Sequence, residues 1–212
     1  MKRREFSLSA AAAAVAAGTL TLPAWAQPRE GKDYRKLAKP APTDTSAGKV
    51  EVVEFFGYFC PHCNSFEPVL GAWAKAAPKD IVLHRVPVNF NAKTVPMQKL
   101  YYTLEGLGKL EPLHAQAFRY IHVERKPLQE DEQVFAWAKA QGLDLTKFKE
   151  MYSSFGVANQ VRKATELQQA YDVEGVPAMG VAGRYYVDGT MAGSMENVLR
   201  VVDQLVAQVR KG

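Results

Sequence analysis

The spacing of apolar residues along the chain predicts a strand, a helix and a second strand near its start. Residues 50–56 are mostly Val and Phe, which predicts a short strand buried on both faces. Between residues 61 and 77 the apolar side chains recur at helical spacing, and Pro78 ends the run. Residues 81–90 again predict a strand. A strand, a helix and a strand in this order predict a parallel pair joined by a crossover.

The pattern changes further along the chain. Over residues 95–171 apolar positions follow a period near 3.6, broken by loop signals around Gly106, Pro127 and Gly142, and this predicts several helices. A longer helix is expected at 157–171. Residues 178–187 predict two short strands around Gly183, and residues 195–209 predict an amphipathic helix. Residues 27–48 contain several Pro and Gly residues and predict an extended arm.

The amino terminus has the features of an export signal. Lys2, Arg3 and Arg4 precede an apolar, alanine-rich stretch, and Ala24-Trp25-Ala26 is a small-x-small cleavage site. Residues 1–26 are therefore predicted to be a cleaved signal peptide, since the apolar stretch is short for a bilayer span. The paired arginines also fit the twin-arginine pattern, so the export route stays open. Either route leads out of the reducing cytosol.

Composition argues against nucleic-acid binding. The formal net charge is +5. Removal of the signal, with its three basic residues and one acidic residue, leaves +3. Lys and Arg are then scattered among Asp and Glu, with no basic run, which is typical of a solvated surface. The 186 residues after the signal are enough for one compact domain or one domain with an insertion.

Cys60-Pro61-His62-Cys63 contains the only two cysteines of the chain. A disulfide between them would close almost no loop and so would add little stability, which favours a reactive dithiol. With Cys60 as the N-cap of the predicted helix and Pro61 as its first residue, backbone N–H groups and the helix dipole would favour the Cys60 thiolate. His62 would add a cation or a donor. Cys60 is therefore expected to be the attacked sulfur, and the more shielded Cys63 the resolving one.

Other uses of the cysteines are less favoured. A c-type haem site needs His directly after the second Cys, where this chain has Asn64. Zinc would need two of His84, His114 and His122 as further ligands, but their spacing matches no zinc pattern. An inert structural disulfide is the remaining alternative.

Several motifs together resemble the DsbA family of periplasmic thiol:disulfide oxidases, which belongs to the thioredoxin superfamily. They stand in that family's order, and they are Glu54-Phe55-Phe56, Phe59-Cys60-Pro61-His62-Cys63, Phe66-Glu67, Val88-Asn89-Phe90 and Gly175-Val176-Pro177-Ala178-Met179. The resemblance implies an α/β thioredoxin fold interrupted by an all-helical domain. The thioredoxin-like part would comprise residues 49–92 and 170–212, and the helical insertion residues 93–169.

The resemblance also implies roles for residues near the cysteines. It implies a cis bond between Val176 and Pro177, with the Val176 backbone pairing with an extended substrate peptide. Val176, Pro177 and Met179 are thus expected to bind substrate, with Val176 and Met179 lining a shallow apolar groove.

Two carboxylates are expected beside the dithiol. Glu51 and Glu54 differ in strand parity, so one of them is expected to be buried, and the family position selects Glu54 to handle the proton of Cys63. Glu67 lies four residues after Cys63 on the same helix face, with a solvated helix residue as the alternative interpretation. Arg85 stands where relatives carry a lysine, so proton handling is expected to differ here.

The function that these features predict is donation of the Cys60–Cys63 disulfide to reduced, unfolded exported proteins in the periplasm. A DsbB-like membrane quinone reductase would reoxidise the dithiol. The chain has no flavin or nicotinamide motif, so no cofactor and no metal are expected, and the protein is expected to be a monomer. The alternatives are a disulfide isomerase or reductase of the same superfamily, and a non-catalytic chaperone or binding module.

Aromatic residues of the helical region are expected to form core: Tyr101, Tyr102, Phe118 and Trp137.

Overall fold

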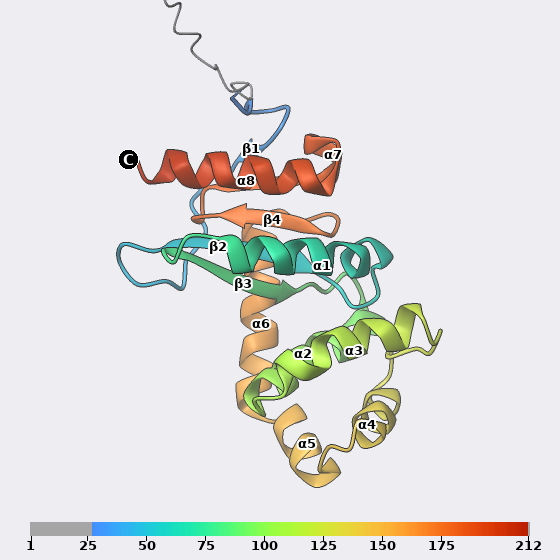
Figure 1. The fold of residues 1–212 in the computed structure, drawn as a ribbon. Coiled ribbons are helices and arrows are strands. Elements are labelled where there is room, and N and C mark those ends of the chain that lie inside the picture. The colour runs from blue at the N-terminus through green and yellow to red at the C-terminus, as the bar shows by residue number, and fades with distance from the viewer. Residues whose placement is uncertain (1–26, 212) are drawn as a thin grey trace, which may run out of the picture.

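A five-stranded sheet forms the centre of the protein in a computed structural model that describes residues 27–211 (Figure 1). The predicted signal peptide lies outside the described residues. The strand order is β1-β5-β4-β2-β3. The strands are β1 (Arg35–Lys36), β2 (Val50–Phe56), β3 (Ile81–Pro87), β4 (Ala178–Val181) and β5 (Tyr185–Asp188).

Strand β2 lies between β3 and β4 and is buried along its whole length. It pairs with β3 in parallel and with β4 antiparallel. The parallel pair and the two short strands around Gly183 confirm the sequence predictions. A strand that is covered on both faces needs apolar side chains on both, which explains its continuous Val and Phe content.

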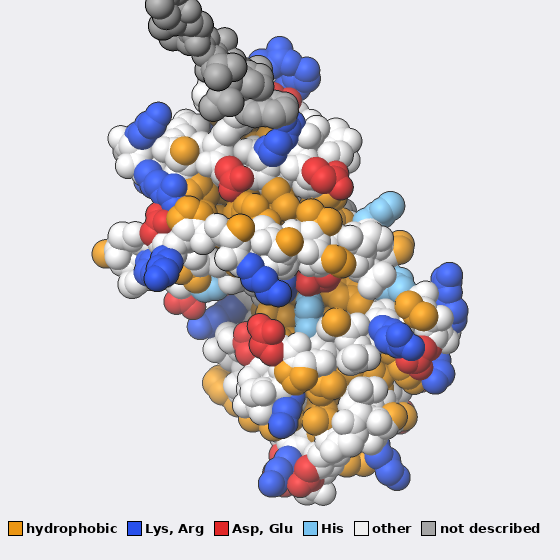
Figure 2. Space-filling view, viewed as in Figure 1, with side chains coloured by type: hydrophobic (Ala, Val, Ile, Leu, Met, Phe, Trp, Pro, Cys, Tyr) orange, Lys and Arg blue, Asp and Glu red, His pale blue; other side chains and the backbone are white. Residues whose placement is uncertain are grey.

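Helices α1 (Pro61–Ala76) and α8 (Met195–Val209) cover one face of the sheet. Phe66 and Leu70 of α1 pack with Val198 and Val202 of α8 over Val52 of β2. Figure 2 shows hydrophobic side chains along the line where the two helices meet, with charged side chains on their outer surfaces. The short α7 (Gly189–Ala192) leads into α8.

Five α-helices lie between β3 and β4 in the chain and form the lower part of the molecule in Figure 1. They follow a short 3-10 helix, η1 (Ala92–Thr94), and are α2 (Val95–Gly106), α3 (Leu110–His122), α4 (Asp131–Ala140), α5 (Leu145–Tyr152) and α6 (Phe155–Ala170). The four aromatic side chains expected to form core are all buried. Together these helices confirm the predicted insertion of helices into a thioredoxin fold.

Three parts of the chain differ from the sequence prediction by more than one residue. Strand β3 ends at Pro87 rather than at residue 90, because the following backbone is held by side chains: Gln98 donates to the Pro87 carbonyl, and Gln168 pairs with Asn89. Helix α6 begins at 155 rather than 157, since Ser154 caps it. The predicted extended arm contributes β1, which pairs with β5 at the edge of the sheet.

No helix among residues 27–211 is long and apolar enough to cross a membrane.

Candidate active site

Cys60 is the N-cap of α1 and Pro61 is its first residue, as the sequence predicts. The backbone N–H of Cys63 donates to the Cys60 sulfur at 3.3 Å. Both cysteines are free thiols in this structure. Cys60 is 7% exposed whereas Cys63 is fully buried. The helix therefore presents one sulfur of the pair to the surface and hides the other.

The surroundings of the two sulfurs move their proton affinities in opposite directions. A hydrogen bond from the Cys63 thiol is the main cause that lowers the pKa of Cys60 to about 6. Burial opposes this shift, while the backbone N–H groups of Cys63 and His62 and the charge of the exposed His62 side chain add to it. Burial raises the pKa of Cys63 well above its ordinary value. At neutral pH Cys60 is thus a thiolate and Cys63 a thiol.

The chain segment before β4 lies against the exposed sulfur. The Cys60 sulfur lies 3.3 Å from the backbone carbonyl oxygen of Val176, to which it donates when it is protonated. The Val176–Pro177 peptide bond is cis, as the family resemblance implies. Pro177 is buried and Val176 is partly exposed.

Met179 does not lie where the sequence-based expectation put it. Its side chain is fully buried in the core between the sheet and helices α1 and α8. Alternation along β4 sends this side chain to the core face, so it does not line an accessible groove. The expectation for the Met179 side chain is therefore wrong.

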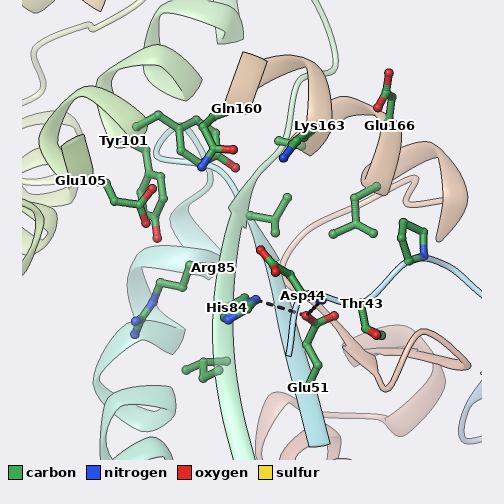
Figure 3. Close-up of a pocket in the computed structure, with 16 residues that line it drawn as sticks. Thr43, Asp44, Glu51, His84, Arg85, Tyr101, Glu105, Gln160, Lys163 and Glu166 are labelled. Carbon is green, nitrogen blue, oxygen red and sulfur yellow. Dashed lines mark hydrogen bonds and ion pairs between the residues drawn. The ribbon is translucent and has the colours of Figure 1, made fainter. Parts of the chain in front are cut away.

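Glu51 and Glu54 are both buried, on opposite faces of β2. Glu54 shares the α1 face with Val50 and Val52, and it lies opposite Arg85 in the parallel register. Glu51 faces the other side, where its carboxylate lies 3.2 Å from His84 Nδ1 and accepts from the Asp44 backbone N–H at 2.7 Å (Figure 3). The sequence predicted only one buried carboxylate, because the partners of Glu51 come from distant segments.

Glu54, Glu67, Arg85 and His114 form a buried ion cluster beneath the cysteines. Arg85 Nε lies 3.1 Å from Glu54 Oε2, and the Arg85 guanidinium donates two hydrogen bonds to Glu67 at 3.3 and 3.2 Å. His114 Nε2 lies 3.1 Å from Glu67 Oε1. Glu67 is thus a partner in an ion network rather than a solvated helix residue.

The two carboxyl groups of the buried ion cluster differ in proton affinity. Burial raises the pKa of Glu54 well above its ordinary value, and the Glu67 charge raises it further against the opposing effect of Arg85. Burial also acts on Glu67, but the His114 hydrogen bond and the His114 and Arg85 charges outweigh it, so the pKa of Glu67 is lowered. Glu54 therefore binds a proton more strongly than an ordinary glutamate does, and Glu67 binds one less strongly.

The sequence analysis did not place His114 and His122 near the cysteines. The Tyr58 hydroxyl and His114 Nδ1 are 2.8 Å apart, and His122 Nε2 lies 2.8 Å from the Tyr58 carbonyl. Helix α3 brings both histidines over the turn that precedes Cys60. Sequence inspection noted these histidines only as candidate zinc ligands, since helical periodicity does not show which distant turn a helix covers.

A separate hollow of about 730 Å³ lies on the α6 side of β2 and β3 (Figure 3). Polar residues from the arm, the sheet and α2 and α6 line it, among them Asp44, Glu51, His84, Glu105 and Lys163. Neither cysteine lines it. Among residues 27–211, no group of three or more His, Cys, Asp or Glu side chains is placed to hold a metal ion.

Comparison with known proteins identifies the family. Residues 51–200 match the model of the DSBA-like thioredoxin domain. The chain belongs to the DsbA-like thioredoxin family. The protein is a thiol:disulfide oxidoreductase of this family and carries a Cys-x-x-Cys pair, Cys60 and Cys63.

Relatives within the DsbA-like family match over most of their length. The thiol:disulfide interchange protein DsbA of Bordetella parapertussis is 45% identical over all 212 residues of both chains. The protein of that name from Pseudomonas aeruginosa is 38% identical over 85% of each.

Solved structures of the family agree with the fold. The crystal structure of Pseudomonas aeruginosa DsbA has a TM-score of 0.80 and 38% identity, over 85% of this chain and 94% of that one. The oxidoreductase DsbA from Xylella fastidiosa has a TM-score of 0.81 and 30% identity, over 87% and 99%.

Proposed function

We propose that the protein is a thiol:disulfide oxidase that donates the Cys60–Cys63 disulfide to reduced, newly exported proteins. The observation that carries this proposal is the asymmetry of the pair: an accessible sulfur with a pKa of about 6 beside a fully buried one. A stabilised Cys60 thiolate favours the reduced form of the pair, so the disulfide form is a strong oxidant.

The reaction would take place in two exchange steps. A substrate thiolate attacks Cys60, the Cys60–Cys63 bond breaks, and Cys63 leaves with the electron pair and takes up a proton. A second substrate cysteine then attacks the mixed disulfide, so that a substrate disulfide forms and Cys60 leaves as a thiolate. Two electrons pass from the substrate to the enzyme.

Glu54 is the group we assign to the proton of Cys63. A buried carboxyl whose pKa is raised can hold a proton at neutral pH and give it to a leaving thiolate. Glu67 and Arg85 would act through Glu54, because their charges set its proton affinity.

The backbone next to Cys60 supports a mode of substrate binding. The Val176 carbonyl lies 3.3 Å from the Cys60 sulfur, and an extended peptide could pair with this segment as an added strand. Val176 would provide the backbone contact. Pro177 would fix the position of this segment.

The cellular setting follows from the same proposal. Residues 1–26 would direct export to the periplasm, where the protein would work as a monomer. Reduced enzyme would pass its two electrons to a DsbB-like membrane quinone reductase. We further propose that residues 49–92 and 170–212 form one thioredoxin-like unit, with residues 93–169 as its helical insertion.

Equilibration of the protein with glutathione buffers tests the proposed oxidase. We expect a reduction potential more oxidising than the about −180 mV of protein disulfide isomerase. A value near the about −270 mV of thioredoxin would contradict the oxidase and support a reductase. The binding-module alternative is tested separately, since it predicts that a Cys60→Ser and Cys63→Ser double variant keeps full activity in cells.

A further inference from the structure

His114 comes from the inserted helices but lies at the buried ion cluster of the thioredoxin part. Its side chain is 12% exposed. The rings of Phe56, Tyr58, Tyr101 and Phe118 surround it, with centroids 5.3 to 5.9 Å away. A titratable group in such a site interacts more strongly with nearby charges than it would in water.

Both ring nitrogens of His114 have a partner. Nε2 faces the Glu67 carboxylate, which can only accept, so the neutral imidazole carries its proton there. Nδ1 then accepts from the Tyr58 hydroxyl. If the ring takes up a second proton at Nδ1, the Tyr58 oxygen can accept instead. The site thus accommodates both protonation states of His114 without moving the ring.

The charges of the buried ion cluster depend on this ring. Arg85 keeps its positive charge at all relevant pH values, and Glu67 is ionised. Only Glu54 and His114 can change charge. With His114 neutral, an ionised Glu54 would leave two negative charges against one positive charge, whereas a protonated His114 balances them. A proton on His114 therefore favours the carboxylate form of Glu54.

We propose that His114 is a positioning residue for the thiol chemistry: it holds Glu67 against Arg85, and its protonation controls how readily Glu54 gives a proton to Cys63. This inference rests on the proposed oxidase function. It makes the helical insertion part of the proton pathway of the dithiol.

Other titratable and charged groups near His114 come from each element packed against it. They are Glu54 of β2, Tyr58 of the turn, Glu67 of α1, Arg85 of β3, Tyr101 of α2, and Glu111 and His122 of α3 itself. Burial raises the pKa of both tyrosines, which keeps them neutral. Glu111 lies exposed in the first turn of α3.

His122 offers a matched control on the same helix. It contacts the Tyr58 carbonyl rather than a carboxylate, and the Phe118 ring separates it from His114. Replacing it therefore perturbs the same turn without changing the charge next to Glu67.

The test is the rate at which a small dithiol reduces the oxidised protein, measured by stopped flow from pH 5 to pH 8 in wild type and His114→Gln. The ratio of the two rates removes the titration of the dithiol itself. We expect a ratio that changes with pH, because glutamine cannot place a positive charge beside Glu67 as a protonated His114 can. Toward pH 5 the variant should be at least about threefold slower relative to wild type than at pH 8, because a proton on His114 in wild type makes Glu54 a stronger acid toward the leaving Cys63 thiolate.

The controls separate this role from packing. His122→Gln should give a ratio that is constant with pH. Adding His114→Gln to a Glu67→Gln background should have a smaller pH-dependent effect than it has in wild type, because Glu67 is the carboxylate that His114 contacts. Glu67→Gln alone should also give a rate ratio to wild type that changes with pH, which keeps the proposal testable if His114→Gln does not fold.

The outcomes are distinct. A pH-independent ratio for His114→Gln would reduce His114 to a packing role and overturn this inference while leaving the oxidase intact. If wild-type protein oxidised no dithiol, the proposed function and this inference would both fail.

Discussion

At the scale of single residues, β2 shows how position on a strand decides what a buried carboxyl can do. Glu51 and Glu54 are three residues apart and both buried. Glu51 pairs with His84 on the α6 side, away from the sulfurs. Glu54 faces α1, where burial and the Glu67 charge raise its pKa and where its charge also acts on Cys63. Only the second position suits proton exchange with the dithiol.

Glu54→Gln tests this assignment. The amide cannot exchange a proton with Cys63, and general acid–base assistance is worth about 10²- to 10⁴-fold, so we expect release of Cys63 at pH 7 to slow at least about tenfold. The pH dependence of the release rate should change as well. The measurement is the single-turnover reaction of the oxidised variant with a dithiol between pH 5 and pH 8.

Glu51→Gln is the matched control for that experiment. It makes the same substitution in the same strand on the opposite face, and we expect its pH profile to follow wild type. A Glu54→Gln profile that also followed wild type would remove Glu54 from the mechanism.

At the scale of elements, Tyr171 joins the end of α6 to the sheet. Its hydroxyl accepts a hydrogen bond from the Gly183 backbone N–H at 3.0 Å, and its ring packs on Phe55 with centroids 5.0 Å apart. The ring also lies directly against Gly180 of β4, where a β-carbon would overlap it. The missing side chain at Gly180 therefore allows the last inserted helix to pack against β4.

Gly180→Ala is expected to destabilise the protein by about 1–3 kcal/mol, since overpacking forces a buried ring to move. Denaturant unfolding of wild type and variant measures the difference. Gly71→Ala in α1 is the control, because a β-carbon there meets no atom within 4 Å. That change should stabilise by about 0.5–1 kcal/mol through helix propensity. Equal effects of the two substitutions would contradict the packing argument.

At the scale of the whole molecule, the state of the dithiol affects folding stability. The disulfide closes a very short loop and restricts the unfolded chain little. The reduced protein gains stability from the Cys60 thiolate, because the pKa of Cys60 is about 6 when folded against an ordinary 9.0. This contribution is complete above the unfolded pKa and is lost as pH falls through the folded one. Cys63 stays protonated over this range.

The reduced protein should therefore lose stability relative to the oxidised protein between pH 8 and pH 5. We expect the difference in unfolding free energy to shrink by on the order of 1–2 kcal/mol, a figure lowered for solvent screening because the Cys60 sulfur reaches water. Thermal or denaturant unfolding of both redox forms at each pH gives the measurement. A difference that did not change with pH would mean that the Cys60 pKa is not depressed in the folded state.

Across the whole fold, sequence reasoning succeeded where neighbours in the chain determine structure. The strand at 50–56, the helix cap at Cys60 and the helical insertion follow from local spacing and from Pro and Gly signals. It was less accurate for the end of β3, the start of α6 and the edge strand in the arm. Those boundaries depend on caps and side-chain contacts with distant segments.

The amino-acid sequence alone determined the reactive pair, because the Cys60-x-x-Cys63 spacing, the proline at the first helical position and the N-cap geometry all arise within one short segment. Tertiary packing determined the proton partners of that pair. Met179 is buried, and Glu54, Glu67, Arg85 and His114 meet, because three strands and two helices distant in the chain come together there. The proton affinity of a buried group depends on which charges lie within a few ångströms, and only the assembled fold sets those distances.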